Sequence, residues 1–294
     1  MGRSWGGPST RGGSAIPELP EVETVRRELE PWLTGRTILR VELVEAVPGP
    51  KYARLERATG QRIVRVGRRG KFIIMPLSRA GAAPAEELVV HLGMTGVISH
   101  CPPADHLRVR LELDQGPMPT LYFRDVRRFG RFLVVPAGDY RLLPTLDAMG
   151  PEPLSDEFTA RGFHQALLRS SVPVKTYLLS QKPVAGVGNI YADEALWLAR
   201  VHPETPAQLV SRAKAQELHE AIRTVLEASV AAQGTTLNDY RTVNGEVGAF
   251  LEQLAVYGHA EEPCRRCGTP ISRTVIGGRS THFCSRCQRR RRRK

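Results

Sequence analysis

The pattern of apolar and polar positions changes character twice along the chain. Apolar residues first recur at intervals of three and four, which predicts an amphipathic helix over 19–33: Leu19, Val22, Val25, Leu29 and Leu33. Pro31 should kink or end its last turn. From about residue 37 to 135 short β-rich runs alternate with Gly and Pro, and beyond 150 the helical period returns.

The middle region predicts an antiparallel sandwich or barrel, because its runs follow one another without intervening helices. The predicted strands are Ile38–Val44, Arg62–Val66, Lys71–Met75, Leu88–Leu92, Leu107–Leu113, Leu121–Phe123 and Phe132–Val135. The later region predicts helices over 156–169, 174–180 and 189–198, and a long helix from Thr205-Pro206 to about Ala232.

Charge narrows the class of partner. Lys and Arg number 42 against 30 Asp and Glu, a net charge of +12, and the chain stays basic at +6 without its last six residues. Such a surplus attracts phosphate polymers or anionic lipid, and composition alone does not choose between them. No stretch approaches the ~20 apolar residues of a membrane span, and the N-terminus lacks the apolar core of a secretory signal.

Four of the five cysteines form two C-x-x-C pairs near the C-terminus, separated by 16 residues: Cys264, Cys267, Cys284 and Cys287. This is zinc-ribbon spacing, and four thiolates predict one closed, structural Zn²⁺ site. Gly277-Gly278 between the pairs predicts a β-hairpin with Arg279 at its tip. Cys101 stands alone and has no assigned role.

Seven motifs occur in one order. They are PELPEVET from Pro17, Gly70-Lys71, HLGM from His91, DVRRFG from Asp125, GPEPL from Gly150, GVGNIY from Gly186 and the four-cysteine module. Together they resemble the bacterial formamidopyrimidine-DNA glycosylase family over residues 17–288. The resemblance implies a monomeric, cytoplasmic base-excision repair enzyme with no membrane partner. It would bind double-stranded DNA, remove oxidised purines such as 8-oxoguanine and formamidopyrimidines, and cleave the abasic strand by β,δ-elimination.

The resemblance also implies an α+β multidomain fold. Residues 1–16 are expected to be a disordered extension or a misannotated start, and 17–148 a catalytic β-sandwich with an N-terminal helix. Residues 149–258 would form a helix-two-turn-helix DNA-binding domain, 259–288 a zinc-finger hairpin and 289–294 a basic tail.

Four residues match the family's catalytic positions. Pro17 would supply the amine that forms a Schiff base, since an α-amine titrates near ~8, far below lysine. Glu18 would protonate the sugar and open its ring, and Lys71 would contact phosphate and donate a proton during β-elimination. Arg279 would clamp phosphates during δ-elimination. Glu21 is expected either to orient the sugar or only to cap the helix.

Other matches would contact DNA. Met94 and Phe129 would fill the gap left by the flipped base, with Arg127 bonding the orphaned cytosine, although either apolar residue alone would more often be core. Asn189 would bind a phosphate at a helix N-terminus. His106 is a candidate because the family's DNA-contacting histidine is replaced here by Ala104, and Arg169 and Lys175 are further phosphate candidates. Residues 235–248 match the family's loop over the extruded base.

Sixteen residues precede Pro17 in this sequence, which makes its nitrogen an amide that cannot form a Schiff base. Three explanations follow: synthesis starts at the codon of Ile16, the extension is cleaved, or the protein binds damage without catalysis. We expect the first, because the other catalytic positions are intact. An oxidised-pyrimidine enzyme of the related Nei type is the alternative activity, but those sequences usually lack the Leu19-Pro20 form of the motif.

Overall fold

The structure is a computed structural model that describes residues 17–44, 49–79, 81–235, 243–246 and 248–290. The predictions for residues 1–16 and for most of the basic tail lie outside these residues. Among the described helices, none combines the length and apolarity needed to cross a membrane.

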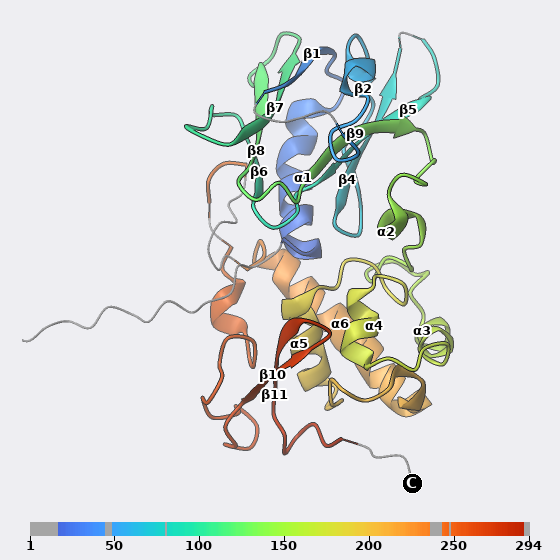
Figure 1. Ribbon diagram of the computed structural model, residues 1–294, viewed down its shortest axis with the longest axis vertical. Helices are drawn as coiled ribbons and strands as arrows, with labels where there is room; N and C mark the ends of the chain where they lie inside the picture. Colours follow the sequence, from blue (N-terminus) through green and yellow to red (C-terminus); the bar gives the residue numbers. More distant parts are fainter. Residues whose placement is uncertain (1–16, 45–48, 80, 236–242, 247, 291–294) are drawn as a thin grey trace, which may run out of the picture.

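Two antiparallel sheets and one helix form the N-terminal part (Figure 1). One sheet has the order β1-β7-β8-β6, and the other has the order β2-β4-β5-β9, with β3 paired to β4. The strands are β1 Ile38–Leu43, β2 Arg62–Ile63, β3 Gly67–Arg69, β4 Phe72–Ser78, β5 Glu86–His91, β6 Gly96–Ser99, β7 Leu107–Leu113, β8 Thr120–Asp125 and β9 Arg131–Pro136. A 3-10 turn, η1 (Leu55–Ala58), precedes β2.

The helix α1 (Leu19–Leu33) lies between the two sheets and supplies part of their common core (Figure 1). Its apolar stripe, including Val25 and Leu29, shares a buried cluster with Val90 of one sheet and Leu111 of the other. The opposite face of β4, β5 and β9 packs on the short helix α2 (Pro144–Asp147). The sandwich therefore packs around α1, and the backbone N–H of Leu19 at the N-terminus of α1 donates to the carbonyl of Gly186 in the second half of the chain.

Helices build the second part. They are α3 Ala160–Leu167, α4 Val174–Leu179, α5 Asn189–Leu198 and α6 Arg212–Ala231, with 3-10 turns η2 Ala207–Leu209 and η3 Phe250–Gln253. Two predicted starts are wrong. Thr159 caps α3, which begins at Ala160 and not at 156, and Ser211 caps α6, so Thr205-Pro206 introduces only η2. A side-chain cap satisfies free backbone N–H groups, and these two caps decided where the helices begin.

The predicted C-terminal hairpin is present as β10 (Ser272–Ile276) and β11 (Arg279–Phe283). Gly277 and Gly278 turn the chain with φ values of 56° and 75°, in the left-handed region that glycine adopts at little cost. The hairpin packs on α5 through β11.

Candidate functional site

Glu18 lies where the N-terminus of α1 meets the N-terminus of α5. Its carboxylate accepts hydrogen bonds from the backbone N–H of Gly188 at 2.7 Å and of Ile190 at 2.9 Å. A helix N-terminus presents unpaired N–H groups and partial positive charge, which suits a carboxylate. Two segments 170 residues apart in sequence are thus joined at one acid, directly beside the buried Pro17.

Lys71 reaches the same point from the turn between β3 and β4. A β-carbon added at Gly188 would lie 2.2 Å from the carboxyl carbon of Glu18 and 2.4 Å from Nζ of Lys71. Position 188 therefore admits only glycine without displacement of both groups, and the ammonium and the carboxylate lie side by side. His91 is also near: its ring packs on Phe72 at 4.6 Å, and burial together with Lys71 and Arg131 lowers its pKa to about 3.

Burial sets the protonation of this pair. It raises the pKa of Glu18 to about 7, against the opposing effect of Lys71. Burial likewise lowers the pKa of Lys71, opposed by Glu18 and Glu21. Near neutral pH the acid can therefore either hold or release a proton, as general acid–base chemistry requires.

The raised pKa of Glu18 makes stability depend on pH. The folded protein retains a proton that the unfolded chain loses between pH 4.5 and about 7, which is worth about 3 kcal/mol at about 1.4 kcal/mol per pH unit. This contribution is complete below pH 4.5 and is lost as pH rises through 7. In urea unfolding at pH 4–8, Glu18→Gln should decline in stability less than the unaltered chain does. The exposed Glu157→Gln is the control, and an equally steep decline in Glu18→Gln would contradict the assignment.

Glu21 acts as a buried cap. Its carboxylate accepts the backbone N–H of Glu18 at 2.9 Å, which completes a capping box. It also accepts the Tyr191 hydroxyl at 2.5 Å and the backbone N–H of Thr235 at 2.6 Å. Of the two predicted roles this geometry favours capping, because the carboxylate is already fully engaged by protein donors.

The β10–β11 hairpin brings Arg279 near the Glu18–Lys71 site. Arg279 is exposed at the start of β11, and its charge contributes to the lowered pKa of Lys71. Asn189, the first residue of α5, donates from Nδ2 to the Ser280 hydroxyl at 3.4 Å, and its side chain opposes the rise that burial causes in the pKa of Tyr257. Tyr257 was missed by sequence reasoning, because no motif surrounds it and only the fold places it beside Asn189.

The prediction that Lys175 contacts DNA phosphate needs correction. Its side chain is 0% exposed, and its ammonium lies 2.7 Å from the Asp193 carboxylate. It also donates to the backbone carbonyl of Ser280 at 2.8 Å and the Thr281 hydroxyl at 2.9 Å. All three N–H donors are engaged inside the protein, so Lys175 docks the hairpin on α4 and α5.

We expect Lys175→Met to lower the free energy of unfolding by about 3–5 kcal/mol, because it strands the buried Asp193 charge. Chemical denaturation would measure this loss. The double variant Lys175→Met/Asp193→Asn should recover much of it, since the uncompensated charge is then gone. Equal stability of the single variant and the unaltered chain would show that the ion pair has no such role.

Two adjacent loops of the sandwich carry Met94, Arg127 and Phe129. Phe129 is 46% exposed, and the Arg127 guanidinium lies 5.1 Å from the centre of its ring. A β-carbon on Gly93 would lie 2.5 Å from the backbone nitrogen of Gly130, so the loops touch backbone to backbone. Phe129 is therefore not a core residue, and its exposed ring beside a guanidinium accords with a role at the surface.

His106 and Arg169 are less clearly placed. His106 has a left-handed φ of 54°, its Nδ1 lies 3.2 Å from the guanidinium of Arg108, and its backbone carbonyl accepts the N–H of Asp125 at 3.1 Å. Arg169 is exposed just after α3, and no described contact joins it to the other predicted residues. Their predicted DNA contacts stay predictions. Residues 236–242 and 247 of the predicted base-covering loop lie outside the described residues.

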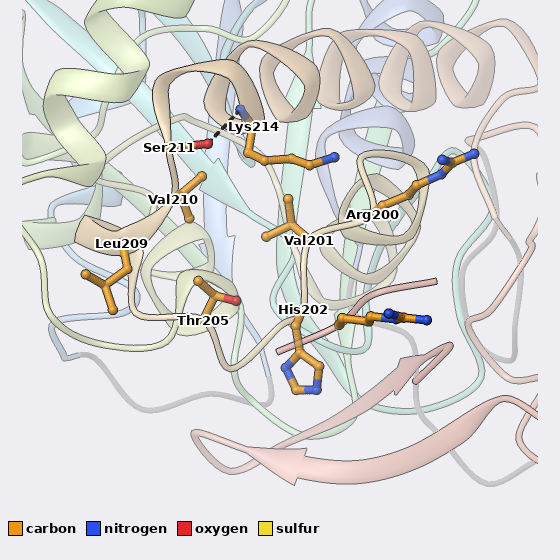
Figure 2. A pocket seen from close by; sticks show the side chains of 9 residues that line it. Arg200, Val201, His202, Thr205, Leu209, Val210, Ser211 and Lys214 are labelled. Atoms are coloured by element: carbon orange, nitrogen blue, oxygen red, sulfur yellow. Dashed lines mark hydrogen bonds between the residues drawn. The ribbon is translucent and has the colours of Figure 1, made fainter. Parts of the chain in front are cut away.

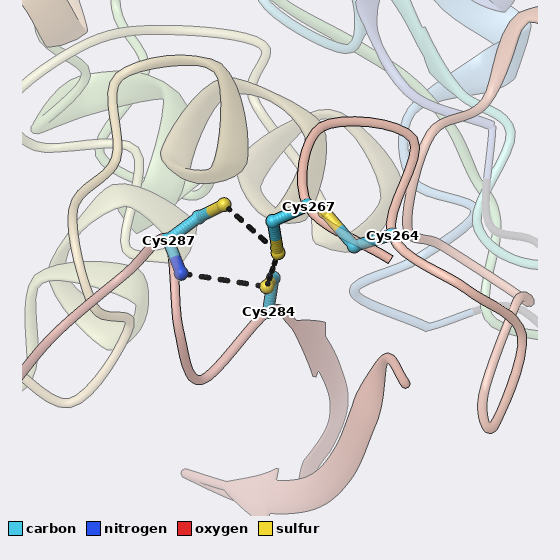
Figure 3. Close-up of side chains that lie close together, drawn as sticks. All are labelled: Cys264, Cys267, Cys284 and Cys287. Carbon is cyan, nitrogen blue, oxygen red and sulfur yellow. Dashed lines mark hydrogen bonds between the residues drawn. The ribbon is translucent and has the colours of Figure 1, made fainter. Parts of the chain in front are cut away.

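The four paired cysteines meet at the base of the hairpin (Figure 3). Their sulfur atoms all lie within 4.8 Å of one another. Tetrahedral Zn–S bonds of about 2.3 Å place sulfurs roughly 3.8 Å apart, so the set fits one zinc ion. The indole N–H of Trp197 donates to the Cys264 sulfur at 3.5 Å, which ties the site to α5. The predicted zinc site is confirmed, and Cys101 is exposed elsewhere.

A separate pocket lies where the segment after α5 meets the start of α6 (Figure 2). Three basic side chains line it, Arg200, Lys214 and Arg289, with Lys214 also paired to Glu217. None of the residues predicted to carry chemistry lines this pocket, so it is not part of the Glu18–Lys71 site.

Comparison with known proteins matches these three parts separately. Residues 16–132 match the formamidopyrimidine-DNA glycosylase N-terminal domain, 149–241 its H2TH domain, and 261–290 a zinc finger found in FPG and IleRS. The formamidopyrimidine-DNA glycosylase of Deinococcus radiodurans is 50% identical over 281 residues, covering 93% of this chain and 97% of that protein.

Solved structures agree with the sequence matches. The crystal structure of MutM (FPG) from Thermus thermophilus is 46% identical and superposes with a TM-score of 0.85, covering 94% of this chain and all of that one. A complex of Lactococcus lactis Fpg with DNA containing an abasic site is 34% identical with a TM-score of 0.80, covering 93% and 100%.

Proposed function

Because the chain belongs to the formamidopyrimidine-DNA glycosylase family, a family of base-excision repair glycosylases, we propose that it removes 8-oxoguanine and formamidopyrimidines from double-stranded DNA and then cleaves the abasic strand. The observation that carries the proposal is the meeting of Glu18 and Lys71 at the α5 N-terminus, beside Pro17. We propose 17–148 as the catalytic domain, 149–258 as the DNA-binding domain and 259–288 as the zinc finger of a monomer.

The first step needs the nitrogen of Pro17 as a free amine. It attacks C1′, and the glycosidic bond breaks with its electron pair leaving on the base. The attacking nitrogen then loses its N–H proton, which balances the proton that the departing base takes up. The nitrogen lone pair then expels O4′ and forms an iminium ion, while Glu18 gives O4′ a proton. A carboxyl with a pKa near 7 is suited to this transfer.

Strand cleavage follows from the iminium, which acidifies the C2′ protons. Loss of one of them expels the 3′ phosphate, and a second elimination expels the 5′ phosphate. The Lys71 amino group lies beside Glu18 and Arg279 offers an exposed guanidinium, so we assign proton donation to the first and phosphate binding to the second. Asn189, at the N-terminus of α5, would bind a flanking phosphate.

The two sandwich loops that carry Met94, Arg127 and Phe129 would fill the gap in the duplex. Met94 and Phe129 enter the gap left by the flipped nucleotide, and Arg127 bonds the orphaned cytosine. Arg127 and Phe129 are exposed and in contact with each other, and the half-buried Met94 lies on the adjoining loop, which supports this assignment.

Borohydride trapping tests the proposal. A chain with Pro17 as its first residue is incubated with duplexes that contain 8-oxoguanine, an oxidised pyrimidine or no lesion. A covalent adduct mainly with 8-oxoguanine supports it. An adduct mainly with the oxidised pyrimidine would indicate the Nei type, and lesion-specific binding without any adduct would indicate a non-catalytic damage binder.

A further inference from the structure

Thr95, which follows Met94, joins the two loops that carry Met94, Arg127 and Phe129. Its side chain is buried, with the residue 5% exposed. The hydroxyl donates to Oδ1 of Asp125 at 2.6 Å and accepts the backbone N–H of Arg127 at 3.0 Å. The Thr95 hydroxyl oxygen therefore bonds two residues of the opposite loop, Asp125 where the loop begins and Arg127 within it.

Asp125 extends this connection to the far side of the loop. It is 0% exposed, and its Oδ2 accepts the backbone N–H of Gly130 at 2.7 Å. The buried Arg108 donates from Nε to its backbone carbonyl at 2.9 Å. The exposed segment 126–129 therefore begins after Asp125 and ends before Gly130, whose N–H the Asp125 carboxylate accepts. The other oxygen of that carboxylate accepts the Thr95 hydroxyl.

The segment itself is strained and exposed. Arg128 has a left-handed φ of 54°, which costs free energy for a residue with a β-carbon. Lys51 donates to the Arg128 carbonyl at 2.6 Å, and its ammonium lies 5.5 Å from the centre of the Phe129 ring. Such a turn persists only when its surroundings determine it, and the Thr95–Asp125 bond is the part that also involves the Met94 loop.

We propose that Thr95 is a positioning residue that makes the two loops one rigid unit, so that Met94, Arg127 and Phe129 enter the duplex together. The inference rests on the proposed function, because it assumes that these side chains fill the space of a flipped nucleotide. Pre-organisation matters there, since a loop that must be ordered on binding loses affinity and selectivity.

The test compares Thr95→Val, which keeps the shape but removes the hydroxyl, with Thr95→Ser, which restores it. Thr95→Val should lower kcat/KM on 8-oxoguanine opposite cytosine by about tenfold and weaken the preference for cytosine over adenine, which is also the effect we expect of Arg127→Ala. Cleavage of a single-stranded abasic oligonucleotide should be unchanged, because no duplex gap has to be filled. Thr95→Ser should behave like the unaltered chain.

Hydrogen exchange of the Arg127 backbone amide provides a readout independent of activity. The Arg127 amide should exchange about tenfold faster in Thr95→Val and at its original rate in Thr95→Ser. Thr95→Ala replaces Thr95→Val if the latter does not fold. Unchanged exchange together with unchanged base preference overturns the positioning role, as does equal loss on single-stranded abasic DNA. Lack of excision by the unaltered chain would instead overturn the proposed function, while exchange still decides whether the loops are coupled.

Discussion

A chain that begins Met-Pro17, with the methionine removed in the cell, should form a borohydride-trapped adduct with DNA containing 8-oxoguanine, whereas a chain that retains residues 1–16 should form none. Acylation removes the basic lone pair of the Pro17 nitrogen, and no rearrangement of α1 can restore it. We expect trapping of the short chain and none of the long chain. The adduct is measured by its shift on a denaturing gel, after the intact mass of each protein has confirmed its N-terminus.

Binding provides the control for this comparison. The long chain should still bind the duplex, because Lys71, Asn189 and Arg279 are unaltered by the extension. In the short chain, Glu18→Gln should suppress release of the base but retain part of the trapping on a preformed abasic site, whose sugar opens without help. If the long form, verified by mass, cleaved the strand as fast as the short form, another amine would have to be the nucleophile.

Replacement of Cys264 by Ser should release zinc and detach the hairpin that carries Arg279. Structural zinc binding supplies about 10–16 kcal/mol in zinc-finger peptides, and three thiolates hold the ion less well than four. Loss of the ion also removes the partner of the Cys284 and Cys287 sulfurs on the β11 side of the module. DNA affinity should fall about tenfold or more, measured by fluorescence anisotropy alongside zinc content.

Cys101→Ser is the matched control, since Cys101 is exposed and lies outside the cluster. It should retain one zinc per chain and full affinity. A Cys264→Ser protein that kept both would show that the module neither depends on the fourth thiolate nor contributes to binding.

The local sequence pattern was sufficient to predict the elements that neighbouring residues determine. The bounds of α1, β7 and α5 agree with the prediction, because their apolar spacing and flanking residues act within a few positions. The zinc ligands were equally readable, since two tight turns bring their own paired thiolates together. The strands β3 and β6 were missed because each is three or four residues long and forms only through pairing with β4 and β8.

The tertiary structure decided what the charged residues do. From sequence Lys175 and Arg279 are both basic residues near DNA-binding motifs, but folding buries the first against Asp193 and exposes the second. The meeting of Glu18, Lys71 and Gly188, and the bond from Thr95 to Asp125, join residues 30 to 170 positions apart. Sequence alone identified the candidates through their motifs. Their pKa values and partners come from burial and contact, which depend on how distant segments pack and have no local signal in the chain.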